Sequence, residues 1–139
     1  MATEGPLLHD GAQCVAAANY SNSQSLSGPS GSGQFLAVVL TSAGRTVALT
    51  ASVGVQIYGI LQNKPTSGTV ADVGFMGVTK AVAGGTIAAG AALMTNASGQ
   101  LVTWTAGSGY AQVGYAIEAA VSGQTFTAFI GPTSPKVLT

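Results

Sequence analysis

The sequence predicts an all-β fold, and three observations support this prediction. Short runs of β-branched and apolar residues are separated by Gly, Ser, Asn and Pro at short intervals. Glycine makes up 20 of the 139 residues, and single or paired glycines stand where a short strand would have to turn. Apolar residues make up 47% of the chain, enough for one core in one domain. We therefore expect a small barrel or a folded-over sheet.

The first 33 residues differ in composition from the rest. Two short apolar spots, at 7–8 and 14–18, precede a stretch rich in Ser, Asn, Gly and Pro, which favours an extended segment over a packed element. We predict that residues 1–33 form an N-terminal arm, 34–131 a β domain and 132–139 a C-terminal tail, whose two prolines prevent a regular central strand. The arm is either a tail without fixed structure or a segment that adds strand hydrogen bonds to a partner.

The β domain is expected to hold eight strand-forming runs between turn signals. In chain order, these runs are 35–40, 45–50, 53–62, 69–78, 91–95, 101–105, 111–120 and 125–130. The Ala-rich pieces at 88–94 and 117–121 also suit a short helix, but the glycine spacing leaves little room for one of ordinary length. We expect at most one short helix.

Charge is scarce throughout the sequence. Only 6% of the residues are charged, against about 25% in an ordinary soluble domain. The formal net charge is zero and the mean hydropathy is +0.44, so copies repel one another weakly and tend to associate. The apolar stretch 81–94 is shorter than the roughly 20 residues of a membrane span. Four scattered basic residues make no nucleic-acid surface, so neither a membrane nor a direct nucleic-acid partner is expected.

The chain offers little material for catalysis or metal binding. Six side chains are metal donors, four of them within the first 33 residues: Glu4, His9, Asp10, Cys14, Asp72 and Glu118. A Ser-His-Asp site built on His9 and Asp10 would need a rigid setting that an arm does not supply. The single cysteine excludes an internal disulfide. We predict no catalytic residue, no cofactor and no metal site.

Aromatic residues fall into two groups. The first lies in apolar runs and is expected in the core: Phe35, Tyr58, Phe75, Phe126 and Phe129. The second flanks the turn at 107–109 and comprises Trp104, Tyr110 and Tyr115. These three are candidate anchors for contacts between subunits, because exposed aromatic residues are frequent at interfaces.

A framework of turns and small residues runs from 53 to 130. It consists of Gly59, Asn63, Pro65 and Gly68, then Val78, Val82, Gly84, Gly85, Ile87 and Gly90, then 96–99, Gly114, Ala116, Ala119, Ala120 and Gly123. This framework resembles the capsid cement, or head decoration, proteins of tailed bacteriophages. The resemblance implies a small β fold of the β-tulip or β-clip type. It also implies a non-enzymatic homotrimer on the outer surface of the mature head.

Such a protein would bind the major capsid protein where capsomers meet and stabilise the shell against the pressure of packaged DNA. It would be made in the host cytoplasm and carried on the virion. The resemblance does not cover residues 1–33, where we expect the coat-protein contacts Leu7, Leu8, Cys14 and Val15. An alternative is a carbohydrate-binding or adhesive β module on a virion surface, with Trp104, Tyr110 or Tyr115 as its sugar platform.

Overall fold

The fold is all-β, as predicted. A computed structural model describes residues 2, 5–11, 13–21, 26–106 and 109–131. These residues form eleven strands and one short 3-10 helix, η1 (Pro29–Gly31). The strands are β1 (Leu7–His9), β2 (Cys14–Ala16), β3 (Ala37–Leu40), β4 (Thr46–Leu49), β5 (Gly59–Leu61), β6 (Val70–Ala71), β7 (Val73–Val82), β8 (Ala92–Thr95), β9 (Leu101–Thr103), β10 (Gly114–Ala116) and β11 (Thr125–Ile130). Within the described ranges, no helix has the length and apolar character needed to cross a membrane.

All eleven strands belong to one sheet, which is not closed into a barrel. Its order is β6-β2-β4-β3-β5-β7-β11-β10-β8-β9, and β1 pairs with β7 off this path. Every pairing is antiparallel except that of β2 with β4. Both ends of the path return toward β7. Asp72 alone separates β6 from β7, and Ala83, just beyond β7, bridges to Leu101 of β9.

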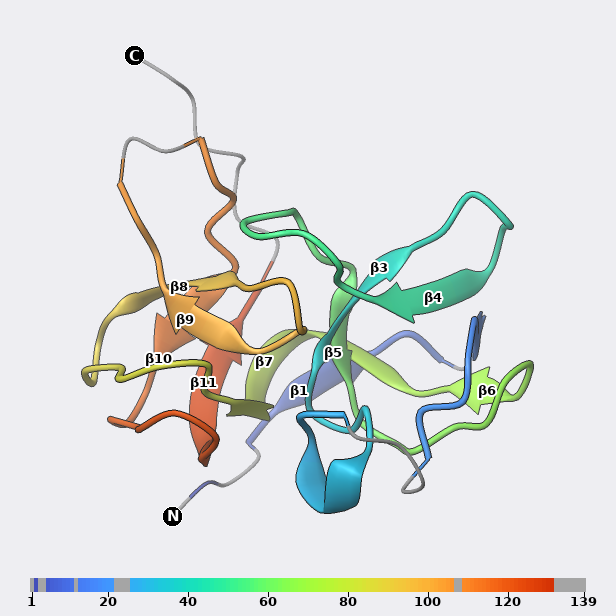
Figure 1. Ribbon diagram of the computed structural model, residues 1–139, viewed down its shortest axis with the longest axis horizontal. Coiled ribbons are helices and arrows are strands. Elements are labelled where there is room, and N and C mark those ends of the chain that lie inside the picture. Colours follow the sequence, from blue (N-terminus) through green and yellow to red (C-terminus); the bar gives the residue numbers. More distant parts are fainter. Residues whose placement is uncertain (1, 3–4, 12, 22–25, 107–108, 132–139) are drawn as a thin grey trace.

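The sheet therefore curls into two lobes that share β7 (Figure 1). The N-terminal lobe contains β2 to β6 and encloses a cluster formed by Cys14, Ala16, Tyr20, Val38, Val47, Leu61, Ala71 and Val73. The C-terminal lobe contains β7 to β11 and encloses a larger cluster that includes Phe126, Leu93, Leu101 and Ile130. That cluster also takes Leu36 and Ile60 from the N-terminal half of the chain, so neither lobe packs independently of the other.

An irregularity in β7 lies at the junction of the lobes. β5 pairs with β7 at Val73 and Gly74, whereas β11 pairs with it from Gly77 to Val82. Along the β1 ladder, Leu8 opposes Met76 but His9 opposes Gly74, so Phe75 is an extra residue on β7. Such a bulge bends a strand and redirects its side chains. It allows one strand to belong to both lobes of the curled sheet.

The described part of the N-terminal segment belongs to the same sheet. β1 pairs with β7, and β2 lies between β4 and β6. Tyr20 is buried, and its hydroxyl oxygen accepts a hydrogen bond from the Leu49 N–H at 3.3 Å. In this conformation the strands at 7–9 and 14–16 pair with their own chain. The division at 33/34 and 131/132 stays a prediction, and the tail at 132–139 lies outside the described residues.

Candidate functional site

The four predicted coat-protein contacts occupy different environments. Leu8 is 55% exposed on β1, whereas Cys14 is 4% exposed in the core of the N-terminal lobe. Leu7 is half-buried, with its side chain against Gly74, and Val15 is half-buried on β2. Leu8 alone of these four is placed to meet a partner without a change in the sheet. The other three stay predicted contacts that require the N-terminal strands to separate.

The three predicted subunit anchors also lie in different environments. The Trp104 indole N–H donates to the Tyr110 carbonyl at 2.9 Å, and both side chains are half-buried. The Tyr110 ring lies so close to Gly54 that a methyl group there would overlap it. Tyr115, by contrast, is 48% exposed on β10. Trp104 and Tyr110 thus form one packed unit, and Tyr115 lies apart on a strand.

Tyr115 belongs to a continuous apolar surface on the outside of the sheet. It opposes Phe129 on β11, Phe129 opposes Val78 on β7, and cross-strand partners share a face. Met76 lies two residues before Val78 and opposes Leu8 on β1. Ile117 follows Tyr115 by two residues and is half exposed. We call this surface the apolar face, and its residues are Leu8, Met76, Val78, Tyr115, Ile117 and Phe129.

The geometry around Gly131 supports this continuity. A methyl group built on Gly131 would lie 3.6 Å from Cε2 of Phe129 and 3.9 Å from Cγ of Met76. The two side chains therefore flank the same glycine. Exposed apolar patches of this kind, contiguous over several strands, mark interaction surfaces on soluble proteins.

The placement of Phe129 overturns one expectation. It was predicted in the core, but it is 43% exposed, whereas Phe126 is buried. In a strand, positions three apart point to opposite faces. The spacing of Phe126 and Phe129 within one short run was the signal that could have located this surface from the sequence.

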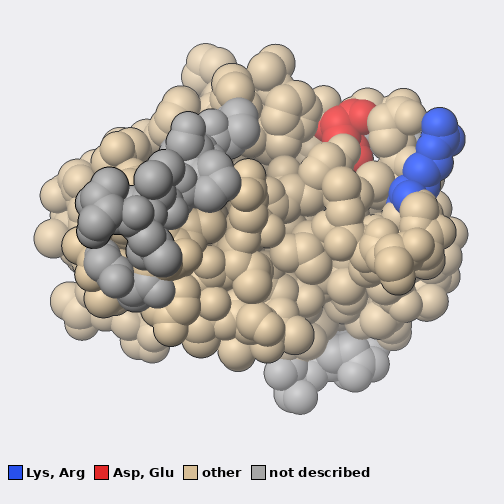
Figure 2. Space-filling model, turned by 90° about the horizontal axis from the view of Figure 1, so that it is seen from above, with Lys and Arg blue, Asp and Glu red and all other residues tan. Residues whose placement is uncertain are grey.

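Charged residues make up only 6% of the chain. Figure 2 shows one side of the molecule, on which Lys, Arg, Asp and Glu occupy only a small area toward one end. Arg45, Lys64 and Lys80 come from three separate segments, and the Lys80 ammonium lies 5.5 Å from the centre of the Phe35 ring. The described residues therefore present no continuous basic surface for a polyanion.

Glu118 follows Ile117 of the apolar face and accepts a hydrogen bond from the backbone of β11. Its Oε2 accepts a hydrogen bond from the Thr127 N–H at 2.8 Å. Hydrogen bonds from the Thr127 side chain and backbone lower the pKa of this carboxyl. A carboxyl whose pKa is lower in the folded state stabilises the fold when ionised, and this contribution is lost as the pH falls through the folded pKa.

The variant Glu118→Gln tests this contact. The amide oxygen retains an acceptor for the Thr127 N–H but does not titrate. We expect the melting temperature of the wild type to fall more than that of the variant between pH 6 and pH 3, measured by circular dichroism. Parallel curves for the two proteins would show that the carboxylate contributes nothing.

Cys14, Asp10 and Tyr58 form a small polar cluster under β2. Burial raises the pKa of the Cys14 thiol, the Asp10 carboxylate raises it further, and hydrogen bonding with Tyr58 acts in the opposite direction. Burial also raises the pKa of Tyr58, again with Asp10 adding to the effect. A thiol kept protonated is a poor nucleophile and metal ligand. The cluster is suited to holding β2 in place rather than to catalysis.

Cys14 therefore reports whether β2 stays in the sheet. In the free protein, we expect a soluble thiol reagent to label Cys14 at least roughly 100-fold more slowly than in the urea-unfolded chain, because labelling requires local opening. With an aromatic disulfide as the reagent, the absorbance of the aromatic thiolate that it releases measures this rate. Rapid labelling without urea would mean that the N-terminal strands separate spontaneously.

A second polar contact joins His9 and Asp72. His9 Nδ1 lies 2.7 Å from Asp72 Oδ1, and this contact joins β1 to the residue between β6 and β7. Both side chains are more than 40% exposed, so the contact contributes little to stability. Across the described ranges, no three His, Cys, Asp or Glu residues converge where they could hold a metal ion.

The chain is similar to known phage proteins. A family model described as "Phage cement protein" matches residues 32–131. A solved structure of the N base of head fiber gp8.5 in bacteriophage phi29 aligns with a TM-score of 0.61, covering 91% of this chain and 93% of that chain. The sequence identity is 17%, so the likeness shows a shared fold. No curated protein matches the chain.

The family match spans both lobes from before β3 to the end of β11, and so covers most of the chain. It supports a capsid-associated structural role as a virion component, in keeping with the scarcity of charge and the apolar face. The chain belongs to the phage cement protein family.

Proposed function

We propose that this protein is a non-enzymatic cement that binds the outer surface of the mature phage head at capsomer junctions and stabilises it against the pressure of packaged DNA. The observation that carries the proposal is the family match over residues 32–131. The partner is the major capsid protein, and the binding surface is the apolar face. A ligand that binds only the assembled shell shifts the shell away from its disrupted states by mass action, so no chemistry is needed.

The apolar face suits this role because it lies on paired strands. Leu8, Val78, Phe129 and Tyr115 come from four adjacent strands, so backbone hydrogen bonds fix their relative positions. A docking surface that is ordered before binding loses little conformational entropy on binding. Glu118 and Lys80 at its border supply the polar rim that is usual around an apolar interface.

We assign Tyr115 to the capsid contact and keep Trp104 and Tyr110 for the contact between copies in a homotrimer. Leu7, Cys14 and Val15 contact the coat protein only if β1 and β2 transfer to it. Deleting residues 1–33 would remove these strands and part of a core cluster, so it would test folding as well as docking. Labelling of Cys14 on bound particles tests the transfer without a deletion.

The decisive experiment mixes the purified protein with expanded and unexpanded shells that lack it. We expect binding to expanded shells, with a higher temperature of shell rupture in proportion to occupancy. Cosedimentation measures the binding, and light scattering measures the rupture. Equal binding to both shell forms, or occupancy without stabilisation, would contradict the cement function. Binding to a glycan array in the absence of shells would favour the carbohydrate-binding alternative.

A further inference from the structure

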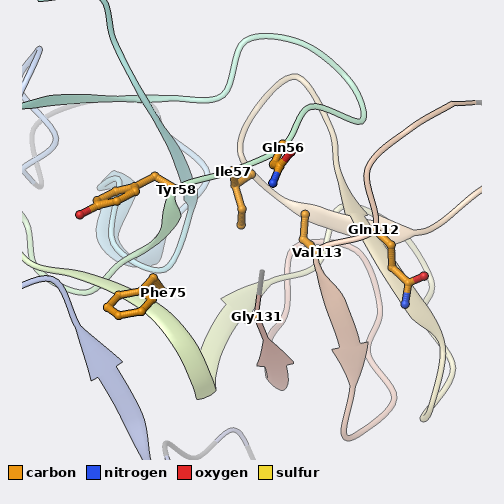
Figure 3. A pocket seen from close by; sticks show the side chains of 7 residues that line it. All are labelled: Gln56, Ile57, Tyr58, Phe75, Gln112, Val113 and Gly131. Atoms are coloured by element: carbon orange, nitrogen blue, oxygen red, sulfur yellow. The ribbon is translucent and has the colours of Figure 1, made fainter. Parts of the chain in front are cut away.

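A pocket of about 250 Å³ opens beside β7, where segments from both lobes meet (Figure 3). Residues 56–58, just before β5, form one wall, and Gln112 and Val113, just before β10, form the opposite wall. Phe75 and Gly131 complete the lining. Phe75 is the bulge residue of β7, so the irregularity at the junction of the lobes forms part of the pocket wall.

The lining is apolar, with amides at its edge. Figure 3 shows the Ile57 side chain directed toward the space above Gly131, with Tyr58 and Phe75 on one side and Val113 on the other. Gln56 and Gln112 are the amide-bearing residues, and none of the lining residues is charged. Water in such a pocket finds few partners, which favours an uncharged, apolar occupant.

The backbone beside the pocket can also bind a partner. Among the described residues, no hydrogen bond engages the backbone of Gln56, Ile57 or Gln112. Their N–H and C=O groups therefore stay available next to apolar walls. Unpaired main-chain groups beside a side-chain pocket are the features by which a protein binds an extended peptide strand.

The position of the pocket indicates which partner supplies that peptide. Gly131 lines the pocket and also lies between Phe129 and Met76 of the apolar face. A partner docked on the apolar face thus reaches the pocket without a break in contact. The volume is below the range of about 300–1,000 Å³ typical for small-molecule sites, and it suits one large apolar side chain.

We propose that this pocket receives an apolar side chain from an extended segment of the coat protein, whose main chain bonds to the free groups at residues 56–57 and 112. This inference rests on the proposed function, because it needs the chain docked on the head. It adds a specific anchor to the broad apolar contact.

A photoreactive aliphatic amino acid in place of Ile57 identifies the occupant on assembled particles. The residue is close to isoleucine in size, and Figure 3 shows the Ile57 side chain directed toward the space above Gly131. We expect cross-links, read by mass spectrometry, to one apolar segment of the coat protein. Three results would overturn the inference: cross-links to residues 132–139 of this protein, cross-links to any other part of a neighbouring copy of it, or no cross-link to a protein.

A blocking variant provides an independent test. Gln56 is exposed, so Gln56→Trp is expected to cover the pocket without altering the core and to lower the affinity for shells by about tenfold or more. Ser67→Trp places the same side chain at an exposed site on the N-terminal lobe, outside residues 1–33, and should leave the affinity unchanged. Equal affinity for Gln56→Trp and the wild type would reject the pocket but leave the cement function standing. Failure of the wild type to bind shells would reject both.

Discussion

Replacing Phe129 with serine is expected to weaken binding to phage heads by roughly 10- to 100-fold. The ring is 43% exposed, so about 90 Å² of apolar surface is available for burial on docking, worth about 2 kcal/mol. It lies between Tyr115 and Val78 in the middle of the apolar face, where contact residues contribute most. Cosedimentation with shells over a range of protein concentrations measures the change.

Leu40→Ser is the matched control for this variant. Leu40 is 54% exposed on β3 of the N-terminal lobe, outside the apolar face. Both variants are expected to stay folded but to melt below the wild type, since each side chain is about half buried and its loss removes apolar burial worth about 2–3 kcal/mol. Binding is therefore compared at a temperature at which circular dichroism shows both variants to be folded. Equal loss of affinity in the two variants would show that the apolar face has no special role in docking.

Gly114→Ala is expected to lower the free energy of unfolding by at least about 3 kcal/mol. A methyl group at this position would overlap the carbonyl oxygen of Phe129 and lie 2.9 Å from Cα of Ile130. Both obstacles are backbone atoms of β11, so no rotation of a side chain relieves the overlap. β10 and β11 would have to separate, which would open the core of the C-terminal lobe and disrupt the apolar face.

Gly85→Ala makes the same chemical change in open space. No atom lies within 4 Å of a methyl group there, and we expect an effect of only a few tenths of a kcal/mol. Urea unfolding followed by tryptophan fluorescence gives both values. If Gly114→Ala unfolds at the same urea concentration as Gly85→Ala, the pairing of β10 with β11 is wrong.

The fold class could be predicted because strand propensity and glycine spacing are local signals. The first and last residues of individual strands were harder to predict from the sequence. The run at 53–62 contributes only β5 at its end, because Gly54 takes a φ of +71° that ends any regular strand. The Ala-rich piece at 88–94 contains no helix, since Gly90 has a φ of +84° and β8 begins two residues later.

The N-terminal strands β1 and β2 could not be predicted from local sequence signals. β1 and β2 have three residues each, too few for an alternating pattern, and polar, glycine-rich stretches surround them. The apolar spots at 7–8 and 14–18 were their only trace in the sequence. What holds them in the sheet is pairing with β7, β4 and β6, which depends on residues far along the chain.

The sharing of β7 by two lobes has a consequence for the order in which the chain folds. During synthesis, the partners of the N-terminal lobe are all available once Val73 has emerged, and His9 can then meet Asp72 across a separation of 63 residues. The C-terminal lobe has to wait for β11, which begins only at Thr125. Leu36 and Ile60 stay without their final neighbours until then. Such long-range closure is slow, so a nascent chain stalled before Thr125 would expose apolar surface and be prone to aggregate.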